Sequence, residues 1–128
     1  MPLTSQTLAT GPFKGGLVAE QNDRFRATLG TDPAVPGRIV VTAGVDALSA
    51  EAKAQIITAV RSFSEFTADN DPFGLHDFGV VEVTEGSRAV RLYWKLDLYD
   101  LAYEFGSEAP DDPSRTRRLL TLLLPDEW

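Results

Sequence analysis

The densest group of chemically reactive side chains lies between residues 67 and 77. It holds three carboxylates and the only histidine of the chain: Asp69, Asp71, His76 and Asp77. Carboxylate oxygens with one imidazole nitrogen suit Mg²⁺ or Mn²⁺ better than a structural zinc ion. The spacing also resembles the start of a Ca²⁺ loop, although Val80 stands where such a loop needs its last glutamate. A divalent-metal site is therefore one interpretation of this segment.

The same segment has the composition of a turn, and this is the favoured interpretation. Asp and Asn side chains bond their own backbone, Pro72 fixes φ, and Gly74 accepts a positive φ. His76 and Asp77 are also candidates for a general base and its orienting carboxylate. Adjacent strand residues point to opposite faces, so the two would not touch once the strand has begun. A hydrogen-bonded structural histidine is the simpler expectation.

A second polar group lies on a predicted helix and consists of Asn22, Asp23, Arg24 and Arg26. The spacings of three and four residues let these side chains meet. They form either a recognition surface, in which an arginine meets phosphate or carboxylate, or an exposed face tied by local pairs. The second interpretation is preferred.

The most distinctive pattern is acidic. Carboxylates recur at intervals of three, four, four and three residues, with one more adjacent: Asp97, Asp100, Glu104, Glu108, Asp111 and Asp112. On a continuous helix they would line one face about 5–6 Å apart, which approaches the charge spacing of a nucleic-acid strand. Such a ladder could imitate phosphate against a basic groove. Gly106 and Pro110 interrupt the helix, and a solubilising surface is the alternative.

The charge distribution points to a partner rather than to a nucleic acid. The net charge is −7, and residues 65–128 carry six basic and fourteen acidic groups. This acidity argues against direct nucleic-acid binding and favours a basic protein partner. The face formed by Arg91, Tyr93 and Lys95 could contact phosphates, or could pair its charges across strands with Glu82.

Several classes of protein are excluded by composition. The chain has no cysteine and one histidine, so thiolate metal sites, disulfides and two-imidazole sites are ruled out. It has no apolar run long enough to span a membrane. The first residues lack the features of a signal peptide, so a cytoplasmic protein is expected. No cofactor is expected apart from the Mg²⁺, Mn²⁺ or Ca²⁺ alternative.

The periodicity predicts an α+β domain that positions these groups. We expect helices over 17–29, from the N-cap Ser49 to 63, and briefly over 98–105. We expect strands over 38–42, 78–84 and 88–97, the last two forming a hairpin. Residues 117–124 are either a strand or a helix, and a strand is favoured because the hairpin needs a third partner.

These elements predict a flexible tail over residues 1–15 and a single domain over 16–128. The domain is expected to hold a mainly antiparallel sheet of about four strands, with two to three helices on one face. Its core should include the alternating face of the second hairpin strand, formed by Val90, Leu92, Trp94 and Leu96.

Several sequence blocks resemble a family of small bacterial proteins of unknown function, DUF3768. The blocks are Gln21–Arg26, Val45–Leu48, Phe66–Gly74, His76–Gly79, Trp94–Asp97 and Thr116–Thr121. The resemblance implies no assigned activity and provides no catalytic residues. It does imply genes on mobile elements, near anti-restriction and DNA-processing genes, so an accessory or counter-defence role is expected by association.

The leading hypothesis is a non-enzymatic, acidic inhibitor protein, of anti-restriction or anti-CRISPR type. It would bind a basic nucleic-acid-handling protein through the carboxylates between residues 97 and 112. The alternative is a divalent-metal-dependent enzyme that uses residues 67–77. A homodimer is also possible, with Tyr99, Tyr103 and Trp128 exposed at its interface.

Overall fold

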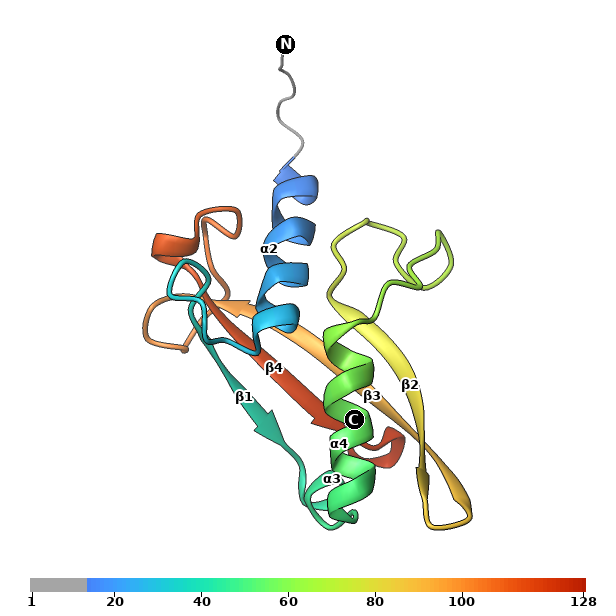
Figure 1. Cartoon of the computed structure of the whole chain (residues 1–128). Coiled ribbons are helices and arrows are strands. Elements are labelled where there is room, and N and C mark those ends of the chain that lie inside the picture. Colours follow the sequence, from blue (N-terminus) through green and yellow to red (C-terminus); the bar gives the residue numbers. More distant parts are fainter. Residues whose placement is uncertain (1–13) are drawn as a thin grey trace.

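The structure, a computed structural model, describes residues 14–128 and consists of one four-stranded sheet with helices (Figure 1). The elements are α2 (Lys14–Thr28), β1 (Gly37–Val41), α3 (Ala43–Asp46), α4 (Ala50–Arg61), β2 (Phe78–Glu85), β3 (Arg88–Tyr99), η1 (Pro113–Arg115), β4 (Arg117–Leu123) and η2 (Pro125–Glu127). The predicted α+β class is confirmed.

The strand order of the sheet is β1-β4-β3-β2. β3 pairs antiparallel with both β2 and β4, while β1 pairs parallel with β4. The sheet is therefore mixed and mostly antiparallel, and residues 117–123 form a strand. The predicted hairpin is also confirmed. Its two-residue turn places Gly86 first with φ 64°, which suits a type II′ turn.

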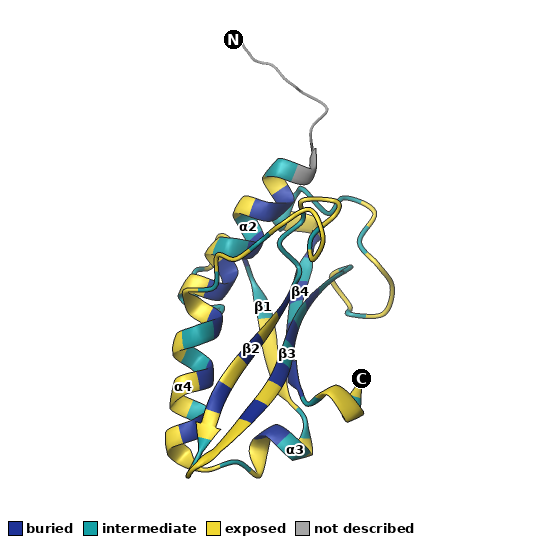
Figure 2. Ribbon diagram, turned by 90° about the vertical axis from the view of Figure 1, so that its right-hand side faces the viewer, coloured by how far each residue is buried: buried dark blue, intermediate teal, exposed yellow. Residues whose placement is uncertain are grey.

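The core lies on one face of the sheet. The alternating residues Val90, Leu92, Trp94 and Leu96 of β3 are all buried, and they join Phe25 of α2 and Ile56 of α4 in one cluster. Figure 2 shows α2 and α4 along the same side of the sheet. Gly79 lies opposite Trp94, and a Cβ there would clash with the indole ring. The hairpin therefore closes only because this position has no side chain.

Helix α4 follows directly from its sequence pattern. The Ser49 hydroxyl accepts a hydrogen bond from the Ala52 amide, as an N-cap should. Ala52, Ile56 and Val60 recur on the buried face. The Glu85 carboxylate, from the end of β2, accepts a hydrogen bond from the Ser49 amide at 3.1 Å. The cap and the hairpin turn are thus tied together.

The predicted short helix over 98–105 is wrong. β3 continues to Tyr99, and the chain then turns back, with a bridge between Tyr99 and Gly106. The Asp100 amide donates to the Phe105 carbonyl at 2.8 Å, and Tyr103 has φ 58°. The Asp100 carboxylate accepts hydrogen bonds from backbone amides that a helix would use, as turn residues do. In addition, the pairing of β3 with β4 keeps the chain extended as far as Tyr99.

Two further boundaries differ from prediction. α2 begins at Lys14, inside the segment expected as a tail, and residues 1–13 of that tail lie outside the described residues. The one-turn helix α3 follows β1 and was not predicted; its residue Val45 is buried. Within residues 14–128, no helix combines the length and the apolar character that crossing a membrane requires.

Candidate functional site

The loop that joins β3 to β4, residues 100–116, holds most of the predicted acidic group. Asp97 lies within β3, and the other five carboxylates lie in this loop, which is irregular apart from η1. The helical ladder predicted for these residues is therefore absent. The acidic residues remain clustered because the loop is compact, and not because they share a helix face.

Three of these carboxylates have structural partners. Asp97 pairs with Lys95 at 3.1 Å. The Asp100 carboxylate accepts hydrogen bonds from the amides of Ala102 and Glu104, at 3.1 and 3.0 Å. Asp112 accepts from Ser114, and these hydrogen bonds hold the pKa of Asp112 below its usual value.

The other three carboxylates have no structural partner, and two of them, those of Glu104 and Glu108, belong to exposed residues. The carboxylates of Glu104, Glu108 and Asp111 have no hydrogen bond or ion pair with any residue in the described range 14–128. Asp111 contacts Gln21 through its backbone, because its carbonyl accepts a hydrogen bond from the Gln21 side chain at 3.0 Å. The loop thus presents uncompensated negative charge.

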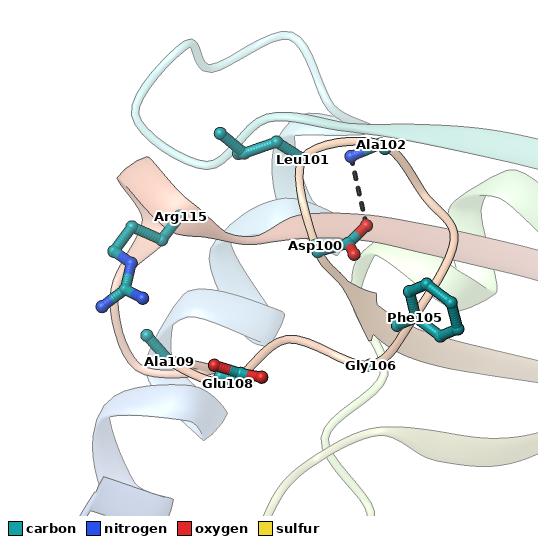
Figure 3. A pocket seen from close by; sticks show the side chains of 8 residues that line it. All are labelled: Asp100, Leu101, Ala102, Phe105, Gly106, Glu108, Ala109 and Arg115. Atoms are coloured by element: carbon teal, nitrogen blue, oxygen red, sulfur yellow. Dashed lines mark hydrogen bonds between the residues drawn. The ribbon is translucent and has the colours of Figure 1, made fainter.

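Two large apolar side chains are exposed in the same loop. Leu101 is 55% exposed and Phe105 is 72% exposed. They line a shallow pocket together with Asp100, Glu108 and Arg115 (Figure 3). Both residues fall in the short helix expected over 98–105, and their exposure was not predicted. Their exposure follows from the turn after Asp100, which directs the loop away from the core.

The second polar region is centred on the buried side chain of Arg26, and it reaches the surface at Asp23 and His76. We call Asp23, Arg26, Phe66, Asp71, His76 and Trp94 the Arg26 cluster. The Arg26 guanidinium donates to the carbonyls of Val60 and Phe63, at 2.9 and 3.1 Å. It lies 4.6 Å from the Trp94 ring centroid and 5.4 Å from that of Phe66.

Arg26 is therefore not part of a recognition surface or of an exposed helix face, although its expected local pair with Asp23 is formed. Its side chain is 2% exposed. Burial lowers the pKa of Arg26, and the neighbouring Asp23 carboxylate opposes that shift. Arg26 donates to the carbonyl of Val60, in the last turn of α4, and to that of Phe63, just beyond the helix, so it caps the C-terminal end of α4 and connects it to α2.

Asp23 joins Arg26 to the histidine. Its carboxylate accepts from the Arg26 guanidinium at 2.5 Å and lies 2.9 Å from the His76 Nδ1 atom. The imidazole stacks on Phe66, with centroids 3.9 Å apart. An orienting carboxylate beside an imidazole is an arrangement that general bases use, but the Nε2 atom faces Asp71 at 3.7 Å. The imidazole thus lies between two carboxylates.

The Asp71 carboxylate forms hydrogen bonds with the backbone of its own loop. Its side chain is 6% exposed, and it accepts hydrogen bonds from the amides of Leu75 and His76. These bonds hold His76 at φ 54°. Within the part of the chain that the structure describes, no group of three or more His, Cys, Asp or Glu residues is placed to hold a metal ion.

The candidate pairing of His76 with Asp77, which was not the favoured interpretation, does not occur among residues 14–128; the imidazole bonds to Asp23 instead. Burial raises the pKa of Asp77, and the nearby Asp71 and Asp97 carboxylates add to this rise. Asp69 is exposed and is separate from this network. Residues 67–77 therefore behave as the turn that the composition indicated.

The remaining helix residues divide between core and surface. Asn22 is buried, and it accepts from Arg118 at 2.7 Å and donates to the Leu75 carbonyl at 2.9 Å. Arg24 is exposed and forms an ion pair at 2.5 Å with Asp32, which lies beyond the end of α2 and was not predicted as its partner. Arg118 was not identified from the sequence. Burial lowers the pKa of Arg118 to about 10.

The aromatic residues predicted for a dimer interface are mostly packed. Arg38 lies 4.1 Å from the Tyr103 ring centroid, and Tyr99 lies 6.3 Å from Tyr103. Trp128 is 70% exposed and packs edge-on against Phe78. Of the three residues, Trp128 alone is exposed as that prediction required.

Comparison with known proteins gives one match. Residues 41–127 match DUF3768, a family described as proteins of unknown function. The chain belongs to the DUF3768 family. No curated protein and no solved structure matches it.

The DUF3768 match covers the loop 100–116 completely and the Arg26 cluster only in part. It includes the whole loop 100–116 and the Phe66–Trp94 part of the Arg26 cluster, but not α2, which carries Asp23 and Arg26. The resemblance found in the sequence blocks is thus confirmed over most of the chain.

Proposed function

We propose that this DUF3768 protein is a protein-interaction module that binds a basic partner through the loop 100–116. The observation that carries the proposal is the exposure of Leu101 and Phe105 beside unpaired carboxylates. Exposed apolar side chains with a charged rim are typical of binding surfaces. A large aromatic side chain such as that of Phe105 is a common energetic anchor.

The charge of this surface favours a basic partner. Residues 97–112 contain six acidic residues and no lysine or arginine. Arg115 is the one basic residue that lines the pocket, where it stands with the carboxylates of Asp100 and Glu108. Complementary charge accelerates association and discriminates between partners more than it adds affinity. A protein with a basic groove for nucleic acid has the required complementarity.

We further propose that binding inhibits this partner. An acidic protein that occupies a nucleic-acid groove competes directly with the phosphates that the groove binds. The role near anti-restriction genes that the family resemblance implies agrees with such inhibition. The alternative of a metal-dependent enzyme has less support, because Asp71 and His76 are hydrogen-bonded within the fold.

The test is affinity capture from a bacterial lysate, with the 128-residue chain as bait and washes of low and high salt. We expect a stoichiometric basic protein that is released at high salt, because screening weakens charge-driven contacts. The same bait with Leu101→Ala and Phe105→Ala should lose the partner. Reversal of Glu104 and Glu108 to lysine should lose it as well.

The matched control reverses two acidic residues elsewhere. Asp69→Lys with Asp126→Lys changes the net charge by the same amount and leaves the loop intact. This control should retain the partner. If the control and the loop variants behave alike, binding depends on net charge alone and the proposed surface is wrong. A partner that is then purified should lose nucleic-acid binding when the wild-type chain is added.

A further inference from the structure

The edge of the sheet formed by β2 carries a second binding feature, which is independent of the proposed function. β2 is the last strand in the order β1-β4-β3-β2, so one side of its backbone has no strand partner. Two shallow grooves run between this edge and α4, and they share Ala59 and Glu82 as lining residues. Figure 1 shows α4 beside β2, at the end of the sheet opposite β1.

The register identifies which backbone groups are open. Leu96 donates to the Asp77 carbonyl at 2.8 Å, so odd-numbered residues of β2 bond to β3. In an antiparallel pair the alternate residues direct both the N–H and the C=O groups outward. The backbone groups of Val80 and Glu82 therefore point to the open edge. No residue within 14–128 forms a hydrogen bond with them from that side.

At the next even position the edge is already occupied. The Gln55 side chain of α4 accepts from the Thr84 amide at 3.0 Å and also lies within 3.5 Å of the Thr84 carbonyl. This side-chain amide thus contacts the outward N–H and C=O groups of Thr84, as a peptide group of a neighbouring strand would. The contact shows that this edge accepts an amide from the direction of α4.

The groove exists because α4 has short side chains beyond Gln55. Ala59 and Ser62 follow Gln55 by four and seven residues, so they lie on the same helix face. Neither is long enough to reach the strand edge, and the grooves lie beside them. The space next to Val80 and Glu82 therefore remains open to a chain from another molecule.

We propose that this edge binds an extended, lysine- or arginine-containing peptide segment of a partner protein as a fifth strand. Main-chain hydrogen bonds to Val80 and Glu82 would provide affinity, as in other additions to a sheet edge. Glu65 and Glu82 line the groove, whereas no lysine or arginine does. This charge selects a basic segment over an acidic one or a second copy of this acidic chain.

The test is an NMR titration of the full chain with two capped seven-residue peptides. One alternates valine with lysine, and the other alternates valine with glutamate. We expect the lysine peptide to shift the amide resonances of Val80, Glu82 and Ser62, and the glutamate peptide to bind at least tenfold more weakly. Shifts centred on Leu101 and Phe105 instead, or no shifts at millimolar peptide, would overturn the edge site.

Two proline variants separate binding from folding. Val80→Pro removes an outward N–H group that the sheet does not use, so the chain should fold and bind the lysine peptide about tenfold more weakly. Val81→Pro removes a ladder hydrogen bond to β3 and should unfold the hairpin. Unchanged affinity of Val80→Pro would contradict the proposal. Glu65→Lys, at an exposed position, provides a second readout and should also weaken binding, without affecting capture through the loop 100–116.

Discussion

The Arg26 cluster and the loop 100–116 are both rich in charged residues, and they differ in what those charges contact. In the Arg26 cluster the guanidinium is 2% exposed and reaches two carbonyls, a carboxylate and two aromatic rings. In the loop, Phe105 is 72% exposed, and three carboxylates have no hydrogen bond or ion pair with any residue in the range 14–128. The first region uses its polar groups to hold the fold together, and the second leaves them available to a partner.

The difference teaches how to interpret polar motifs. A buried charge requires hydrogen bonds, and Arg26 meets most of this requirement with Asp23 and two carbonyls, although its Nε atom and Trp94 Nε1 have no partner among residues 14–128. An exposed apolar side chain has no such requirement, and it loses contact with water only when a partner covers it. Changes in the first region should therefore alter stability, and changes in the second should alter binding.

The largest effect is expected for Arg26→Ala. This change removes the Arg26 hydrogen bonds to the Asp23 carboxylate and to the carbonyls of Val60 and Phe63, and it leaves a cavity beside Trp94. We expect a loss of about 3–5 kcal/mol in the free energy of unfolding, measured by urea denaturation. Arg24→Ala, in the exposed pair with Asp32, is the control and should cost no more than about 1 kcal/mol. Equal losses would show that Arg26 is not a structural centre.

His76→Ala should have a smaller effect on the same measurement. The variant loses the hydrogen bond to Asp23 and the stacking on Phe66, for about 1–2 kcal/mol. His76→Asn should lose less, because asparagine tolerates the positive φ of this position. If His76→Asn and His76→Ala lose the same free energy of unfolding, the positive φ of residue 76 does not influence which residue type is stable at this position.

Asp77→Asn tests the raised pKa of Asp77. The pKa of Asp77 is higher in the folded state than in the unfolded state. The folded state therefore holds this proton more tightly, and the protonated carboxyl group stabilises the fold at low pH. This contribution to the free energy of unfolding is lost as the pH rises through the folded-state pKa. The variant should therefore gain stability relative to the wild type between pH 3 and pH 7. Unfolding curves over this range measure the difference, and a gain that is independent of pH would contradict the assignment.

The smallest effect on stability is expected for Phe105→Ala. The side chain is exposed, so the free energy of unfolding should change by no more than about 0.5 kcal/mol, while capture of the partner is lost. Phe25→Ala is the matched control, because Phe25 is fully buried and should cost about 3–5 kcal/mol. A large loss for Phe105→Ala would mean that the loop packs on the core and is not a free surface.

Local patterns in the sequence predicted most of the elements. The cap at Ser49, the apolar stripe of α4 and the alternation of Val90 to Leu96 each depend on neighbours along the chain, and each is confirmed. The hairpin turn at Gly86 was predicted for the same reason. The acidity of residues 97–112 and the turn character of residues 67–77 could also be determined from residue types alone.

Contacts between distant segments were decided by the tertiary structure. Arg26 looked like a surface residue because its periodicity is compatible with exposure, and only the packing of α2 against α4 and Trp94 shows that it is buried. The segment after Leu98 looked helical, but pairing with β4 keeps it extended to Tyr99. Local spacing determines which residues can share a face, whereas burial and strand pairing depend on partners that are far away in the sequence.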